Sequence, residues 1–338
     1  MPTTDQHHID LSAWPSTAAT RLRQLIGQHA HSGQYAVFDA DQTLYGHDLT
    51  ESLLAYLEHQ HILTRANLAP ELQLMPFQDH DDDGPESLYA YYMRLCALDD
   101  NIGYPWIAQC FAGLSLQQLK AAIDELMAYE HPIPIAYVRD GQRHDADAQR
   151  PTRVRGMQQL VHALQSHGIA VYIVSAGHEE AIRMILADAQ YGYHVPPEQV
   201  IGVTTLLRHP QSGHLTTARQ QISAGTYDAA ALLPYVLTTA LWAPLTWYEG
   251  KTAAIKTYID AVQPPILVAG DTPNSDGPML FEAAAEALGG IRLFIERSSD
   301  AVTQLNHLQA LRAGTQEALG LPVSADLGWL IVTHADLA

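Results

Sequence analysis

The chain has 338 residues, 47% of them hydrophobic, and a formal net charge of −19. This length accommodates one large domain, or one domain that carries a smaller one, with a sizeable core. Binding to a phosphate backbone requires clustered Lys and Arg, so the acidic charge excludes nucleic acid as an expected partner. A small phosphate ester still fits, because a metal ion and one lysine can reverse the field locally.

The sequence predicts no contact with a membrane. No apolar run reaches the roughly 20 residues that a membrane-spanning helix needs. The segment from Met1 to His8 is polar, and no apolar stretch with a cleavage-like site follows it. The chain as written is therefore expected in the cytoplasm, whereas a mature exported form in the periplasm would have the same sequence.

Two cysteines, Cys96 and Cys110, are too few for a disulfide scaffold and cannot form a zinc site alone. We expect both to be small buried side chains. The sequence does not decide whether they pair, and it leaves the oligomeric state open.

Short apolar runs alternate with helical patterns along much of the chain. The apolar runs predict buried strands at Tyr35–Phe38, Ala170–Val174 and Pro265–Ala269, and further core strands at Arg292–Ile295 and Gly328–Val332. Helical patterns precede the first three, at Ala18–His29, Gly156–His167 and Thr252–Val262. This alternation predicts an α/β fold with a parallel sheet flanked by helices. Polar residues just after the carboxyl ends of such strands line the ligand crevice.

The residues between the first two strands have almost no strand pattern. Their helical patterns lie at Leu49–His61, Glu86–Ala97, Tyr104–Ala112 and Leu116–Tyr129. We therefore predict a helical cap domain, residues 50–150, inserted into a core that consists of residues 1–49 and 151–338. A second insertion, near Thr204–Trp247, has turn signals, but its chemistry assigns it no role.

Two carboxylates follow the first predicted strand directly, in Asp39-Ala-Asp41-Gln-Thr43. Residues at this spacing along a strand point the same way. Two like charges this close are unfavourable unless a cation lies beside them. Mg²⁺, a hard ion that prefers carboxylate oxygen, would suit this pair. For this motif alone, an acidic turn at a sheet edge is the alternative.

Three further segments carry reactive side chains. Gly270-Asp271-Thr-Pro-Asn-Ser-Asp276 supplies a second acidic pair after the third strand, and Asp271 is expected to complete a metal site with Asp39. Ser175 follows the second strand and offers a hydroxyl to a phosphate oxygen, with backbone N–H groups from the helix expected to start there. Lys251 opens a helix and is one of only three lysines, although an exposed surface lysine is the ordinary alternative.

In this order the four motifs resemble those of the haloacid dehalogenase (HAD) superfamily. The resemblance implies a Rossmann-like core with a cap, and a phosphatase rather than a dehalogenase because Asp41 is present. It implies that Asp39 attacks phosphorus to form an aspartyl-phosphate, and that Asp41 protonates the leaving alkoxide and then activates water. Thr43 and Ser175 would hold phosphate oxygens, and Lys251 would neutralise charge beside Asp39. The implied Mg²⁺ ligands are Asp39, the backbone carbonyl of Asp41, Asp271 and Asp276, the last as a ligand or as a partner of one.

A closer resemblance is to the phosphorylcholine phosphatase family, and it spans nearly the whole chain. The stretches that carry it are Tyr35–Asp39, Asp48–Leu54, Tyr91–Cys96, Gly103–Trp106, Thr216–Ile222 and Gly270–Asp276. It implies a small phosphomonoester substrate, phosphorylcholine first, whose quaternary ammonium group would bind aromatic faces and a carboxylate. The cap offers six suitable groups: Glu51, Tyr89, Tyr91, Tyr92, Tyr104 and Trp106. The candidate substrate-binding residues among them are Glu51, Tyr89, Tyr92 and Trp106, and packing between helices is the alternative for each.

Two alternatives stay open. The family pattern has two adjacent acidic residues where this chain has Thr50-Glu51, so phosphoserine and phosphoethanolamine remain alternative substrates. A non-catalytic ligand-binding protein on this fold is the alternative from another class. Lost catalytic residues would indicate such a protein, and in this chain all of them are present.

Overall fold

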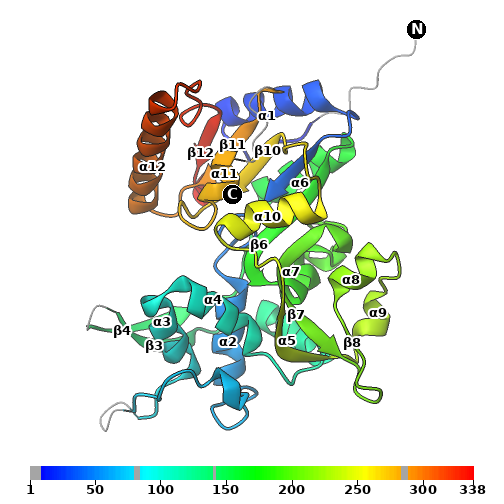
Figure 1. Ribbon diagram of the computed structural model, residues 1–338, viewed down its shortest axis with the longest axis vertical. Coiled ribbons are helices and arrows are strands. Elements are labelled where there is room, and N and C mark those ends of the chain that lie inside the picture. The colour runs from blue at the N-terminus through cyan, green and yellow to red at the C-terminus, as the bar shows by residue number, and fades with distance from the viewer. Residues whose placement is uncertain (1–8, 80–83, 140–141, 283–287) are drawn as a thin grey trace.

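A computed structural model describes residues 9–79, 84–139, 142–282 and 288–338 (Figure 1). Within these residues the main sheet has eight strands, in the order β12-β11-β10-β1-β6-β7-β8, with β9 also paired to β7. The strands are β1 (Tyr35–Phe38), β6 (Ala170–His178), β7 (Val200–Arg208), β8 (Leu215–Thr216), β9 (Val236–Trp242), β10 (Leu267–Gly270), β11 (Ile291–Ile295) and β12 (Trp329–Val332). The strands from β12 to β7 pair in parallel, and β8 and β9 pair antiparallel with β7. The predicted α/β fold is confirmed.

Helices cover both faces of this sheet (Figure 1). They are α1 (Ser16–His29), α6 (Arg155–Ser166), α7 (Glu179–Leu186), α10 (Glu249–Tyr258), α11 (Gly277–Glu282) and α12 (Ser299–Ala318). Successive side chains of a strand point to opposite faces. In β1, Ala36 and Phe38 therefore join the core beneath α1, α6 and α7, while Tyr35 and Val37 join the core beneath α10, α11 and α12. Because both faces are covered, all four residues of β1 are buried, as expected for a central parallel strand.

The long segment after β1 begins and ends at paired strands. β2 (Tyr45–Gly46) and β5 (Thr152–Arg153) pair antiparallel, so the chain enters and leaves this segment side by side. Between them lie α2 (Leu49–His59), α3 (Leu88–Leu98), α4 (Asp100–Gln109) and α5 (Leu116–Ala128), together below β10, β11 and β12 in Figure 1.

The expectation of almost no strand in this segment is wrong. β3 (Ile133–Arg139) and β4 (Gln142–Ala148) form an antiparallel hairpin that packs on α3 and α2. β4 has no apolar pattern that would predict a strand, because it is polar and mostly exposed. Its backbone pairing with β3 maintains it, rather than an apolar face.

The second insertion attaches to the helical segment through backbone hydrogen bonds. It contains β8, β9, α8 (Ala218–Ser223) and α9 (Ala229–Leu232). The N–H of Gly113 donates to Leu237 O at 2.9 Å, Leu237 N–H to Leu114 O at 2.8 Å, and Leu116 N–H to Tyr235 O at 2.9 Å. These bonds occupy part of the edge of β9, which would otherwise be open to pairing with another chain.

The remaining short elements are 3-10 turns: η1 (Pro70–Leu72), η2 (Ala189–Tyr191), η3 (Pro197–Gln199) and η5 (His334–Leu337). Cys96 and Cys110 are both free, and Cys110 is buried as expected, whereas Cys96 is half-buried. Across the described ranges, no helix is both long enough and apolar enough to span a membrane.

Candidate active site

The carboxyl ends of β1 and β10 bring two acidic segments together. These strands are adjacent and parallel, so Asp39, just after β1, lies beside the loop that begins at Asp271. Lys251, in the first turn of α10, donates from Nζ to Asp39 Oδ1 at 2.5 Å and to Asp276 Oδ1 at 2.6 Å. Lys251 is only 1% exposed and Asp39 is 5% exposed, so these ion pairs are shielded from water.

Asp39, Asp271 and Asp276 form a compact acidic cluster. Each offers one carboxylate oxygen, and these atoms all lie within 4.8 Å of one another. Burial and the neighbouring Asp276 raise the pKa of Asp271 to about 7. Burial also raises the pKa of Asp39 well above its usual range, although Lys251 opposes this. Crowded buried carboxylates ionise readily only beside a cation, and an all-oxygen donor set fits a hard divalent ion.

The loop that carries Asp276 folds back on its own backbone. Asp276 Oδ2 accepts hydrogen bonds from the N–H groups of Asp271 and Thr272, both at 2.9 Å. A Cβ atom at Gly270 would lie 2.6 Å from the same oxygen, so a side chain at position 270 would displace Asp276. Glycine at this strand end therefore allows the second acidic residue to reach the cluster.

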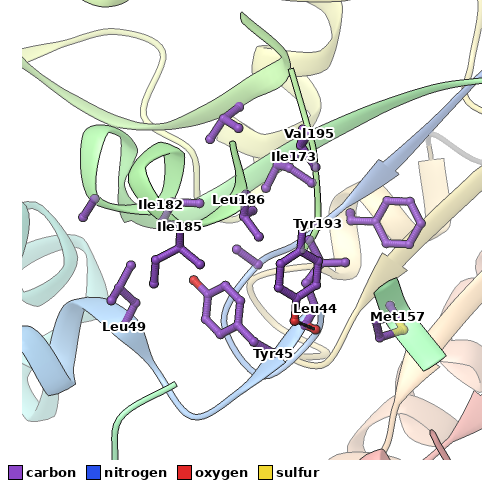
Figure 2. Close-up of a cluster of buried hydrophobic side chains, with 14 of the residues drawn as sticks. Leu44, Tyr45, Leu49, Met157, Ile173, Ile182, Ile185, Leu186, Tyr193 and Val195 are labelled. Carbon is purple, nitrogen blue, oxygen red and sulfur yellow. Dashed lines mark hydrogen bonds between the residues drawn. The ribbon is translucent and has the colours of Figure 1, made fainter. Parts of the chain in front are cut away.

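The carboxylate of Asp41 lies apart from this cluster. Its Oδ1 accepts from Leu49 N–H at 2.6 Å and from the Tyr45 hydroxyl at 2.9 Å. Figure 2 shows Tyr45 and Leu49 in the apolar cluster beside Ile182 and Ile185 of α7, which fixes the loop after Asp39. Burial raises the pKa of Asp41, while its two hydrogen bonds lower it. A carboxyl group with a raised pKa is suited to general acid and base chemistry.

The two hydroxyl side chains lie close to the carboxylates. Thr43 Oγ1 is 3.3 Å from Asp39 Oδ2 and 3.4 Å from Asp271 Oδ1. Ser175 is followed by small residues and then a helix, as expected, although the strand does not end at Val174. β6 continues through an irregular stretch to His178, α7 starts at Glu179, and Ser175 Oγ accepts from Gly177 N–H at 3.1 Å.

A buried ion network fixes the start of α7 behind Ser175. Glu179 is fully buried and accepts from Arg183, from Arg219 Nε at 3.0 Å and from Gly202 N–H at 3.0 Å. The two guanidinium groups and the backbone donor keep the pKa of Glu179 lowered despite its burial. Because Arg219 belongs to α8, this network also anchors the second insertion to the core.

One cavity of about 190 Å³ joins these groups to the helical segment. On the core side it is lined by Asp39, Asp41, Gln42, Ser175, Ala176, Gly177, Lys251, Asp271, Thr272, Ser275, Asp276 and Arg297. On the helical side it is lined by Asp48, Thr50, Glu51, Tyr92, Tyr104 and Ile107. The Tyr92 hydroxyl donates to Glu51 Oε1 at 3.1 Å. Burial raises the pKa of Glu51, and the bond from Tyr92 opposes this.

Comparison with known proteins gives one decisive relationship. The chain is 49% identical, over 324 residues, to phosphorylcholine phosphatase of Pseudomonas aeruginosa, a match that covers 96% of this chain and 92% of that protein. The chain belongs to the phosphorylcholine phosphatase family. Its predicted class, a phosphatase of the HAD type, is confirmed by this membership. No family model matches the chain.

Two solved structures are similar to this chain at low sequence identity. A conserved, functionally unknown protein from Anaerococcus prevotii superposes with a TM-score of 0.58 at 17% identity, covering 88% of this chain and 90% of its own. A protein of unknown function from Bordetella pertussis gives a TM-score of 0.47 at 14% identity, covering 89% and 99%. The first of these likenesses supports the architecture of this phosphorylcholine phosphatase family member and carries no information about its substrate.

Two of the residues predicted to bind substrate lie outside the cavity lining. Trp106 is buried, its Nε1 donates to Leu72 O at 2.8 Å, and its ring stacks on Tyr92 with centroids 6.3 Å apart. Tyr89 lines a larger cavity of about 960 Å³ beneath the β3–β4 hairpin, and its hydroxyl lies 3.4 Å from Glu51 Oε2. Both therefore support Tyr92 and Glu51 rather than line the cavity themselves.

The lining residues that were not among the predicted site residues of this family member include Asp48, Tyr104 and Arg297. Asp48 caps α2 by accepting from Glu51 N–H at 2.8 Å, a capping pattern visible in the sequence. Tyr104 was one of the suitable aromatic groups of the cap but not one of the chosen candidates, because no sequence signal distinguishes it from a packing residue. Arg297 follows β11, and the rule for polar residues after strand ends would have found it.

Proposed function

We propose that this protein hydrolyses phosphorylcholine to choline and phosphate in a Mg²⁺-dependent reaction that passes through an aspartyl-phosphate on Asp39. One observation carries the proposal. A single cavity joins Asp39 beside Lys251 to Glu51 with Tyr92 and Tyr104, so one end suits a phosphate and the other a cation. The name of the Pseudomonas relative supports the same substrate. We further propose that residues 50–150 act as the cap that supplies the cation end.

The proposed nucleophile is the Asp39 carboxylate. Lys251 holds Oδ1, which leaves Oδ2, 3.3 Å from the Thr43 hydroxyl, to attack phosphorus. The bond from Asp39 to phosphorus forms as the bond from phosphorus to the choline oxygen breaks. Asp41 donates its proton to that oxygen, so choline leaves with a hydroxyl group rather than as an alkoxide.

Asp41 acts again in the second half of the reaction. Now a carboxylate, it takes a proton from water as the water oxygen attacks phosphorus, and the bond to Asp39 breaks. Thr43 and Ser175 donate hydrogen bonds to phosphate oxygens. Asp39, Asp271, Asp276 and the Asp41 carbonyl would hold Mg²⁺, which when bound supplies neutralisation of the phosphate charge.

The cation end favours some small phosphomonoesters over others. The ring faces of Tyr92 and Tyr104 suit a quaternary ammonium group, and the Glu51 and Asp48 carboxylates attract its charge. Phosphoethanolamine, with a primary ammonium group, is the second candidate for the same reasons. Phosphoserine carries an additional carboxylate, which Glu51 and Asp48 would repel.

The proposal is tested by initial-rate phosphate release from phosphorylcholine, phosphoethanolamine, phosphoserine and p-nitrophenyl phosphate, each with Mg²⁺ and with excess chelator. We expect Mg²⁺-dependent release and the highest kcat/KM for phosphorylcholine. Equal or faster turnover of phosphoserine or phosphoethanolamine would remove the choline assignment. Full activity in excess chelator would contradict the proposed Mg²⁺ dependence. No phosphate release from any of the esters would favour a non-catalytic binding protein.

Replacing Glu51 with Gln should selectively weaken the binding of cationic substrates. Gln has the same size and keeps the hydrogen bond from Tyr92 but removes the negative charge. We expect KM for phosphorylcholine to rise about tenfold, on the order of a lost 1–2 kcal/mol. KM for p-nitrophenyl phosphate, which has no cation, should change less than about threefold. Glu130→Gln, at an exposed position in residues 50–150, is the matched control, and an equal rise for both substrates would contradict the prediction.

A further inference from the structure

Arg297 is a charged residue at the cavity that the proposed reaction does not use. It lies two residues beyond β11, which pairs in parallel with β10, so it extends from the same sheet edge as Asp271. Its Nη1 is 3.3 Å from Asp271 Oδ2, and its side chain is 48% exposed. This position places a guanidinium group at the open side of the catalytic cavity.

The cavity has many more carboxylates than basic groups. Its acidic lining residues are Asp39, Asp41, Asp48, Glu51, Asp271 and Asp276. Its basic lining residues, among those that the structure describes, are Lys251 and Arg297. Lys251 is buried and already bound to two carboxylates at 2.5 and 2.6 Å. A phosphate that approaches this acidic cavity therefore needs Arg297 to offset repulsion at its mouth.

Arg297 is also held loosely enough to exchange partners. Its ion pair with Asp271 is long compared with the two pairs of Lys251. It borders a second hollow of about 520 Å³ beside the first turns of α12, formed with residues such as Ser298, Gln304 and His307. The guanidinium group thus lies between the acidic cluster and solvent, where it borders both hollows.

We propose that Arg297 binds the phosphate group of the entering substrate and of the released product, exchanging its contact with Asp271 for phosphate oxygens. This inference rests on the proposed function. A guanidinium group presents a planar fork of N–H donors that matches two phosphate oxygens. Its charge also repels an ammonium group, so it orients a zwitterionic substrate with its phosphate toward this edge and its cation toward Glu51.

The test compares Arg297→Ala, Arg297→Lys and the control Arg312→Ala, whose guanidinium pairs with Glu282 away from the cavity. The first measurement is the competitive inhibition constant of inorganic phosphate against p-nitrophenyl phosphate, with KM and kcat. For Arg297→Ala we expect the inhibition constant and KM to rise about tenfold while kcat changes less than about threefold. Arg297→Lys should be intermediate because it keeps the charge but loses the fork, and Arg312→Ala should match the unaltered protein.

A second measurement does not depend on turnover. Inorganic phosphate is titrated calorimetrically, with Mg²⁺ present, into Asp39→Asn protein with and without Arg297→Ala, and we expect Arg297→Ala to weaken binding about tenfold. Unchanged phosphate binding in both measurements would overturn the role of Arg297. If Arg297→Ala lowered the turnover of phosphoserine alone, the proposed role would also be overturned, because Arg297 would then recognise the carboxylate of that substrate.

These results separate the inference from the proposed function. Suppose that Arg297→Ala binds phosphate weakly and that the unaltered protein does not turn over phosphorylcholine. Phosphorylcholine would then be rejected as the substrate, and the phosphate-binding role of Arg297 would be retained. Unchanged phosphate binding together with rapid phosphorylcholine turnover would reject the inference alone.

Discussion

Replacing Asp39 with Asn is expected to abolish turnover and leave the fold intact. An amide oxygen is a poor nucleophile and cannot form the acyl-phosphate, so kcat for p-nitrophenyl phosphate should fall by about 10⁴-fold or more. The amide has the shape of the carboxylate and can still accept a hydrogen bond from Lys251. Removing one of three crowded buried carboxylates also removes repulsion within the cluster.

The measurement is phosphate release over several hours, paired with thermal unfolding of the same preparations. Asp326→Asn, an exposed aspartate outside the cavity, is the control and should retain full activity. We expect the melting temperature of Asp39→Asn without Mg²⁺ to stay within a few degrees of the unaltered protein, or to rise. Activity above about one part in a hundred, with no contaminating phosphatase, would show that another residue is the nucleophile.

The parts of the fold predicted from sequence are those with a local signal. β1 is a run of four buried apolar residues, and parallel pairing with β6 and β10 on either side requires such a run. Asp39 follows this run directly, so one stretch of sequence predicts both the strand and the position of the candidate nucleophile. The acidic pair after β10 was visible for the same reason, and the structure places it beside Asp39.

The parts that sequence missed depend on contacts between distant segments. Tyr92 and Trp106 are both aromatic residues of the helical segment, yet only Tyr92 lines the cavity, because Trp106 is enclosed beside Leu72. Tyr104 lines the cavity, and its ring also contacts the ring of Trp247 of the second insertion, with centroids 6.0 Å apart. No local pattern determines which ring of such a set faces a ligand.

The second insertion also shows a connection that the sequence alone did not assign. Trp247 Nε1 donates to Asn101 Oδ1 at 2.9 Å, and the Tyr248 hydroxyl donates to Asp100 Oδ2 at 2.5 Å, both on α4. One residue earlier, Thr246 Oγ1 donates to Ser175 O at 2.5 Å. The chain then enters α10 and reaches Lys251. The residues just before the lysine are therefore bound to both the helical segment and the irregular part of β6 at Ser175.

Replacing Lys251 with Met should remove activity and also destabilise the fold. Met has a similar length but no charge, so the carboxylates of Asp39 and Asp276 would lose their shared ion-pair partner inside the protein. Burial lowers the pKa of Lys251, but the two carboxylates outweigh burial and raise it, so the lysine is charged in the native state. Leaving buried charges unpaired typically costs about 3–5 kcal/mol of unfolding free energy. We expect that loss without Mg²⁺, and a fall in kcat of about 10³-fold or more with Mg²⁺.

The pH dependence of this loss identifies its cause. Without the lysine, the buried Asp39 carboxylate destabilises the native state only while it is ionised, and burial already holds its pKa above the usual range. The instability should therefore be full at pH 8 and shrink as the pH falls and this carboxylate binds a proton. Urea unfolding at pH 8 and pH 5.5, with and without Mg²⁺, measures this, with Lys256→Met on the exposed face of the same helix as control. A loss of stability independent of both pH and Mg²⁺ would show that Lys251 stabilises the fold by packing rather than by charge.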